Sequence, residues 1–159
     1  MRTLIVYGTR YGAAGKAAGK LAELLSGEVD IINLMQDRAP EVAGYDRVIV
    51  GGSIYAGSVQ EQVKRFCTDN HRQLQQKPLG LFVCCGYEEK AREQLETCLD
   101  PQLIAHAKQL GSFGYEYDFS KMNFVFRLMI RKLANVRESR FNLNEDGIRA
   151  FAATMEAVA

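Results

Sequence analysis

Residues 4–25 read LIVYGTRYGAAGKAAGKLAELL, and this stretch decides the fold. An apolar, β-branched run ends at Gly8, a polar turn follows, and an alanine-rich segment of good helix formers continues from there. A strand that passes through a short turn directly into a helix is the first half of a βαβ unit. The glycine and alanine residues gathered after the strand indicate that another group approaches the backbone closely at this turn.

The same alternation of strand-like and helix-like segments continues along the chain. Strands are expected at residues 2–8, 28–34, 46–52, 79–86 and 109–117. Helices are expected at residues 14–26, 59–75, 88–108 and 144–158, with only a short helix or loop between the second and third strands. The helix that contains Pro101 should break there, and Asn144 is expected to cap the last helix. The alternation predicts an α/β fold with a parallel sheet and right-handed crossovers.

The composition is that of one globular domain over residues 1–159, with 47% hydrophobic and 25% charged residues. A net charge of +1 gives no indication of a nucleic-acid partner. The four cysteines lack the spacing of a metal site, and the adjacent Cys84 and Cys85 are expected to be buried, reduced thiols. No apolar run reaches about 18 residues, and no targeting segment precedes the first strand, so we expect a cytoplasmic protein.

The turn after the first strand is a candidate phosphate site. In open α/β sheets, ligands bind beyond the carboxyl ends of the strands, and a helix N-terminus offers free N–H groups to an anion. The ATPase pattern GxxxxGK[ST] fails at Arg10 and Ala17, and the dinucleotide pattern GxGxxG also fails at Arg10. An ATPase and a nicotinamide-binding protein are therefore disfavoured.

A third phosphate pattern fits better, because the segment YGTRYGAAGKAA resembles the phosphate loop of flavodoxins. Thr9 and Gly12 match the hydroxyl residue and the glycine of that loop, whereas Ala14 replaces a threonine. Arg10 offers charge-assisted hydrogen bonds that would offset the missing hydroxyl. The resemblance implies that the phosphate of FMN is held by Thr9, Arg10, Tyr11, Gly12, Ala13 and Ala14.

The loops after the third and fourth strands extend the resemblance to most of the chain. The segments GGSIYAGSVQEQVKRF and CCGYEEKAREQL occupy the places of the two flavin-binding loops of flavodoxins. The resemblance implies that one wall of the flavin site is formed by Ser53, Ile54, Tyr55, Ala56 and Gly57, and the other by Gly86 and Tyr87. It also implies a doubly wound five-stranded parallel sheet of strand order 2-1-3-4-5, with Tyr55 stacked on the isoalloxazine ring.

Within the family, the segments YDRVIVGGSIYAG and MNFVFRLMIRKLA resemble the subgroup that contains the quinone-dependent protoporphyrinogen IX dehydrogenases. That subgroup has a basic, apolar helical insert after strand five, which corresponds to residues 120–140 here. Residues 121–140 contain six Lys or Arg and one Glu, and the polar residues between 122 and 134 form only a narrow helical stripe. Such a segment suits an anionic membrane at the inner membrane face, an apolar substrate, a dimer contact, or plain packing over the sheet edge.

If the insert serves a substrate or a membrane, Phe124, Phe126 and Met129 should be partly exposed or mobile in the free protein. The side chains of Arg127, Arg131 and Lys132 should then flank them.

Three functions remain open from the sequence. The first is a flavodoxin-like redox protein that passes electrons to a partner protein or a quinone, and the second is a flavoenzyme of the protoporphyrinogen dehydrogenase type. The third is a binding or regulatory domain without flavin. Ala14 favours it, because its methyl group cannot donate a hydrogen bond to a phosphate. We assign no catalytic residue and no metal ligand, because a flavin carries its own redox chemistry and neither His71 nor His106 has a visible Ser or Cys partner.

Overall fold

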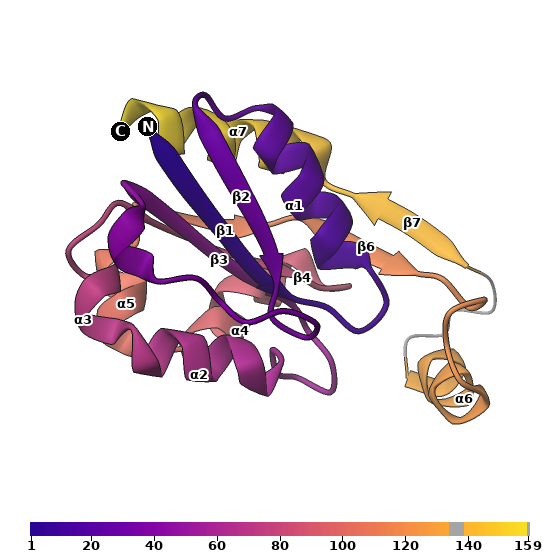
Figure 1. The fold of residues 1–159 in the computed structure, drawn as a ribbon. Helices are drawn as coiled ribbons and strands as arrows, with labels where there is room; N and C mark the ends of the chain where they lie inside the picture. The colour runs from indigo at the N-terminus through magenta and orange to yellow at the C-terminus, as the bar shows by residue number, and fades with distance from the viewer. Residues whose placement is uncertain (134–138, 159) are drawn as a thin grey trace.

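The computed structural model describes residues 1–133 and 139–158 and contains a five-stranded parallel sheet (Figure 1). Its order is β2-β1-β3-β4-β5, which confirms the predicted order. The strands are β1 (Arg2–Gly8), β2 (Glu28–Asn33), β3 (Arg47–Ser53), β4 (Leu79–Cys84) and β5 (Gln109–Ser112). The β-branched and aromatic runs became the central strands because both of their faces are covered, as parallel sheets require.

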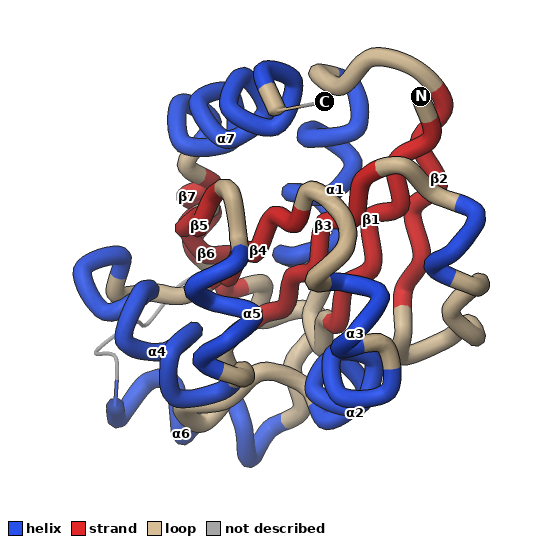
Figure 2. Tube along the Cα trace, turned by 90° about the vertical axis from the view of Figure 1, so that its left-hand side faces the viewer, coloured by secondary structure: helices blue, strands red, loops and turns tan. Residues whose placement is uncertain are grey.

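Helices cover both faces of the sheet (Figures 1 and 2). One face carries α1 (Ala13–Glu23) and α7 (Glu145–Ala157), and the other carries α2 (Glu61–Asp69), α3 (His71–Leu74), α4 (Ala91–Cys98) and α5 (Pro101–His106). Two short 3₁₀ turns, η1 (Val42–Gly44) and η2 (Glu88–Lys90), complete the connections. Side chains alternate along each strand, so Val48 and Val50 enter one core while Ile49 enters the other.

The ends of the helices follow their capping residues. The predicted break near Pro101 is confirmed, since α5 begins at this proline and the carboxylate of Asp100 accepts from the backbone N–H of Gln102. Asn144 caps α7 as predicted, and its side chain accepts from the N–H of Gly147 at 2.8 Å. The single helix predicted for residues 59–75 is wrong, because the chain divides at Asn70 into α2 and α3.

The fifth predicted strand is divided in the structure, which corrects the assignment of residues 109–117. The chain leaves the sheet after β5, and β6 (Gly114–Tyr117) pairs antiparallel with β7 (Arg140–Leu143), a strand that we did not predict. The bend occurs at Gly114, whose φ of +78° suits glycine, and a Cβ there would lie 2.0 Å from the carbonyl oxygen of Asn142. Phe113, just before the bend, is fully buried between Phe82 and Phe151.

The predicted insert is helical and is carried by this two-stranded arm. Helix α6 (Phe124–Leu133) lies between β6 and β7, beyond the carboxyl edge of the main sheet (Figure 1). Its buried side chains belong to a third apolar cluster, separate from the two cores that flank the sheet. The arm therefore brings a helix from late in the sequence to the loops that follow the early strands.

Candidate functional site

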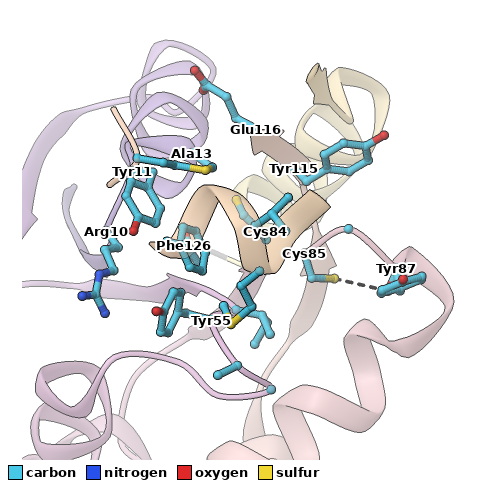
Figure 3. Close-up of a pocket in the computed structure, with 18 of the residues that line it drawn as sticks. Arg10, Tyr11, Ala13, Tyr55, Cys84, Cys85, Tyr87, Tyr115, Glu116 and Phe126 are labelled. Atoms are coloured by element: carbon cyan, nitrogen blue, oxygen red, sulfur yellow. Dashed lines mark hydrogen bonds between the residues drawn. The ribbon is translucent and has the colours of Figure 1, made fainter. Parts of the chain in front are cut away.

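A cavity of about 260 Å³ opens at the carboxyl ends of the central strands (Figure 3). It is bounded by the loops after β1, β3 and β4, and by β6 and the α6 segment. The predicted site residues that line it are Arg10, Tyr11, Ala13, Ser53, Ile54, Tyr55, Ala56, Gly57, Gly86 and Tyr87. Thr9, Gly12 and Ala14 do not line the cavity. The three loops named from the sequence thus meet at one site, although they are far apart along the chain.

The loop after β1 is shaped by Thr9. Its hydroxyl accepts from the backbone N–H of Gly12 at 2.9 Å and lies 3.3 Å from the hydroxyl of Ser53 in the loop after β3. Gly12 adopts a φ of +102°, a left-handed conformation that favours glycine, and it is the N-cap of α1. No side chain caps α1 among the described residues, and its first turn carries no acidic residue. The first-turn N–H groups and the helix dipole are therefore available to an anion.

The position of Ala14 gives a physical reason for its small side chain. Ala14 is fully buried in the core that α1 shares with the sheet, beside Ala17 and Leu21. A threonine at this position would add both a hydroxyl and a methyl group to close-packed surroundings. The alanine therefore reflects the packing of α1 as well as the chemistry of the loop.

Arg10 lies at the rim of the cavity, where its guanidinium is 4.6 Å from the centre of the Tyr55 ring. This is a cation–π arrangement, which fixes the ring of Tyr55 and leaves Arg10 exposed to solvent. Burial raises the pKa of Tyr11, and the positive charge of Arg10 opposes part of that rise. Arg10 thus contacts two aromatic residues of the site in addition to its predicted approach to a phosphate.

Three aromatic rings form a stack at the mouth of the site. Phe126 of α6 lies between Tyr11 and Tyr55 (Figure 3), with ring centres 4.8 Å and 4.6 Å apart. Phe126 is only 7% exposed. Phe126 is therefore not partly exposed, which contradicts that part of the expectation, and it is buried against the two loop tyrosines instead of the sheet. The spacing of Phe126, Met129 and Ile130 along one face of α6 is the sequence signal that indicates this docking side.

The rest of the insert fulfils the expectation only in part. Phe124 is 73% exposed, as predicted, while Met129 is half-buried against the aromatic stack. Arg127 donates to the backbone carbonyls of Phe119 and Met122, so it braces the insert internally.

Of the other two predicted cations, Arg131 lies over the ring of Phe119 and Lys132 is exposed. The outer face of α6 presents Phe124, Val125 and Leu128 to solvent, and these three residues are called the α6 outer patch below.

The far wall of the cavity consists of the end of β4 and the loop after it. Cys84 and Cys85 line the cavity, and the thiol of Cys85 donates to the carbonyl of Tyr87 at 3.3 Å. Burial strongly raises the pKa of Cys84, so this thiol stays protonated. Both thiols are buried and neither forms a disulfide, which confirms the prediction of buried, reduced cysteines. Tyr87 is half exposed and lines the cavity from the loop after β4.

Two charged residues at the site were not predicted, because only the folded arm brings them there. Glu116 of β6 lines the cavity with a nearly fully buried carboxylate, which pairs with the ammonium of Lys16 on α1 at 2.6 Å. The ammonium of Lys121 would lie 3.7 Å from a Cβ at Gly12, and it is 3.6 Å from the carboxylate of Asp118. Lys121 therefore adds a positive charge beside the uncapped start of α1.

Within residues 1–133 and 139–158, no three His, Cys, Asp or Glu side chains gather as metal ligands would. The same described residues include no helix with the length and apolar character needed to cross a bilayer.

Comparison with known proteins adds independent information. A family model of the flavodoxin domain matches residues 4–144. Protoporphyrinogen IX dehydrogenase (quinone) of Escherichia coli K12 is 36% identical over 75 residues, which cover 43% of this chain and 41% of that protein. The chain thus matches about two-fifths of the length of this curated relative.

Solved structures resemble the whole chain at low sequence identity. A Streptococcus pneumoniae flavodoxin matches with a TM-score of 0.58 and 15% identity over 100% of both chains. An archaeal flavodoxin gives a TM-score of 0.60 at 12% identity, over 99% of this chain and 97% of that one. The rubredoxin:oxygen oxidoreductase of Desulfovibrio gigas gives 0.61 at 13% identity, over 98% of this chain but only 35% of that one. At these identities the structural matches show the fold.

Proposed function

Because the chain belongs to the flavodoxin domain family, we propose that it is an FMN-binding redox protein that transfers electrons to a partner protein or a quinone. The observation that carries the proposal is the cavity itself. It lies where the loops after β1, β3 and β4 meet, which is the ligand position of an open α/β sheet. FMN when bound supplies the redox chemistry, and the residues of this chain hold it, orient it and control access to it.

The phosphate end of FMN fits the turn between β1 and α1. The N–H groups of the first turn of α1 have no side-chain cap, and Gly12 leaves open space above the backbone apart from the ammonium of Lys121. Backbone donors, a helix dipole and a nearby cation together favour a phosphate. Thr9 contributes by holding the turn in shape through its bond to the N–H of Gly12.

The ring end of FMN fits the apolar part of the cavity. Tyr55 and Tyr87 line the cavity from the loops after β3 and β4, and most of the remaining lining is apolar. Aromatic side chains stack favourably on a flat heterocycle, with about 0.5 to 1.5 kcal/mol for each pair. No acid–base residue is required for this role, since the protein residues position the ring and exclude water from it.

The proposal is tested by the visible absorption of the purified chain and by titration of the flavin-free protein with FMN. Tyr87→Ala should weaken FMN binding about fivefold, the equivalent of one aromatic pair. Phe141→Ala is the control, because Phe141 is 60% exposed on β7 and does not line the cavity. A colourless protein that does not bind added FMN would refute the proposal and favour a domain without flavin.

A second candidate is a flavoenzyme that oxidises a flat, apolar substrate. The α6 outer patch favours it, because exposed Phe124, Val125 and Leu128 lie on the same helix that closes the cavity. The partial match to a protoporphyrinogen IX dehydrogenase (quinone), 36% identical over 75 residues, supports the same candidate. Turnover of protoporphyrinogen IX with a quinone would support the enzyme, and reduction of a partner protein without such turnover would support an electron carrier.

The α6 outer patch also supports a peripheral contact with an anionic membrane. A helix with an exposed apolar face and neighbouring cations lies stably at a lipid surface, and here Arg131 and Lys132 supply the exposed positive charge. A membrane contact would place the cavity close to a lipid-soluble quinone.

A further inference from the structure

Phe126 occupies a space that a flat ligand of this site would need. Its ring is stacked on Tyr11 with an interplanar angle of 15° and tilted by 36° on Tyr55 (Figure 3). Tyr55 is the aromatic residue that the proposed function assigns to the flavin ring. Building on that proposed function, we propose that Phe126 competes with the flavin ring for Tyr55, so that the insert sets the flavin affinity.

The contacts of Tyr55 explain the competition. Its ring is touched by Phe126 at 4.6 Å between centres and by the guanidinium of Arg10 at 4.6 Å. Both neighbours already occupy stacking positions on Tyr55, and we infer that a third flat group stacks there when one of them withdraws. The cavity of about 260 Å³ is small beside the roughly 300 to 1,000 Å³ that is usual for small-molecule sites, so a nucleotide-sized ligand would gain room from the withdrawal of Phe126.

Phe126 is the neighbour that is able to leave. It belongs to a small apolar cluster with Phe119 and Met122, which is separate from both cores of the sheet. Helix α6 is tied to the rest of the chain through the β6–β7 arm, so its withdrawal opens neither core (Figure 1). Arg127 binds carbonyls within the insert itself, and this internal brace lets α6 move as one piece.

Competition makes flavin binding and α6 docking mutually exclusive at Tyr55. Each event must then weaken the other by the same factor, because the coupling between two binding events is reciprocal. Flavin binding therefore releases α6 from the loops, and a partner that holds α6 away from the cavity strengthens flavin binding.

The test compares FMN dissociation constants of the full chain and of two matched variants. Phe126→Ala should bind FMN about tenfold more tightly, a conservative size for two lost aromatic contacts. Phe124→Ala is the control, because this residue has the same chemistry on the same helix but is 73% exposed and outside the cavity lining. The control should bind FMN as the unmodified chain does.

An FMN affinity of Phe126→Ala that is unchanged or weaker would overturn the inference, since Phe126 would then be a neutral neighbour or a wall of the flavin site. Failure of every variant to bind FMN would instead refute the proposed function. The two failures are therefore distinguishable in one experiment.

Limited trypsin digestion gives a second measurement. Its main comparison, with and without FMN, uses only the unmodified chain and so does not depend on the folding of a variant. Cleavage after Arg131 and Lys132, both exposed near the end of α6, should become faster when FMN is added. Phe126→Ala should be cleaved at that faster rate without FMN. Protection of these two sites by FMN would overturn the inference, because it would show that flavin binding and α6 docking support each other.

Discussion

Lys121→Met is expected to weaken the binding of FMN while leaving the binding of riboflavin unchanged. Riboflavin has the same ring as FMN but no phosphate, so the pair of ligands isolates the phosphate contact. The ammonium of Lys121 lies beside Gly12, at the uncapped start of α1, and methionine keeps the length and apolar stem of lysine without its charge.

The size of the effect follows from charge and exposure. Two unit charges about 4 Å apart interact by about 1 kcal/mol in water and about 4 kcal/mol at an effective dielectric constant of 20. The side chain of Lys121 is 50% exposed and already lies 3.6 Å from Asp118, so the lower value applies. About 1 kcal/mol corresponds to a roughly fivefold weaker FMN affinity.

The measurement is a fluorescence titration of the flavin-free protein with each ligand at low and at physiological salt. The loss of FMN affinity should shrink as salt rises, because the contact is partly exposed. Lys132→Met is the matched control, with the same charge on the same insert but not within 4 Å of a Cβ at Gly12, where the ammonium of Lys121 lies. Equal losses for FMN and riboflavin, or no loss for either, would show that Lys121 does not serve the phosphate.

Three further predictions follow from the structure. Arg10→Ala should weaken FMN binding more than riboflavin binding, because the exposed guanidinium can give the phosphate a charge-assisted hydrogen bond; FMN affinity equal to that of the unmodified chain would exclude this contact. Phe124→Ser should reduce binding to anionic vesicles about tenfold, as expected for the loss of one aromatic side chain buried in the lipid. Leu24→Ser is the control, because Leu24 is an exposed apolar residue at the end of α1, and it should leave vesicle binding unchanged. Equal effects of the two variants would exclude the α6 outer patch as the contact. Hydrogen bonds from Ser26 and Arg47 hold the pKa of the Glu156 carboxyl below its usual value near 4.5. The carboxylate therefore stabilises the fold fully above pH 4.5, and this stabilisation is lost as pH falls through the lower folded-state pKa. Glu156→Gln should lose less urea resistance than the unmodified chain when the pH is lowered, and an unchanged pH dependence would contradict this.

The sheet was predictable because its signals are local. Continuous β-branched runs such as residues 47–50 indicate strands that are buried on both faces, and the turn residues around them mark the ends. The division after Ser112 was not predictable, because residues 109–117 read as one strand and only pairing with the distant β7 draws β6 away. Gly114 is the local sequence signal of this bend, but a glycine inside a strand pattern can equally mark a bulge or the close approach of another backbone or a ligand.

In the candidate site, too, the features with local sequence signals were predictable and those that depend on distant contacts were not. Its three loops could be named because each follows a strand and has turn chemistry of its own. Lys121, Glu116 and Phe126 could not be assigned to it, because their partners lie about 70 to 115 residues away in the sequence. The periodicity of α6 shows that one face is apolar, but the choice between solvent, sheet and loop tyrosines depends on where the β6–β7 arm ends in space.

The insert supplies two groups with opposite effects on flavin binding, Phe126 and Lys121. Removing the insert and comparing riboflavin with FMN distinguishes the two effects. Tyr117 and Arg140 are paired at the end of the arm, so a two-residue Asn-Gly turn can join β6 to β7 in place of residues 118–139. The loss of Phe126 should raise the affinity for the flavin ring about tenfold. The loss of Lys121 should lower the affinity for the phosphate group about fivefold. Riboflavin affinity should therefore rise about tenfold, while FMN affinity should rise only about twofold. Circular dichroism would establish that the shortened chain keeps its sheet. A weaker affinity for both ligands in a folded protein would mean that α6 forms a wall of the flavin site, and the competitive role of Phe126 would then be wrong.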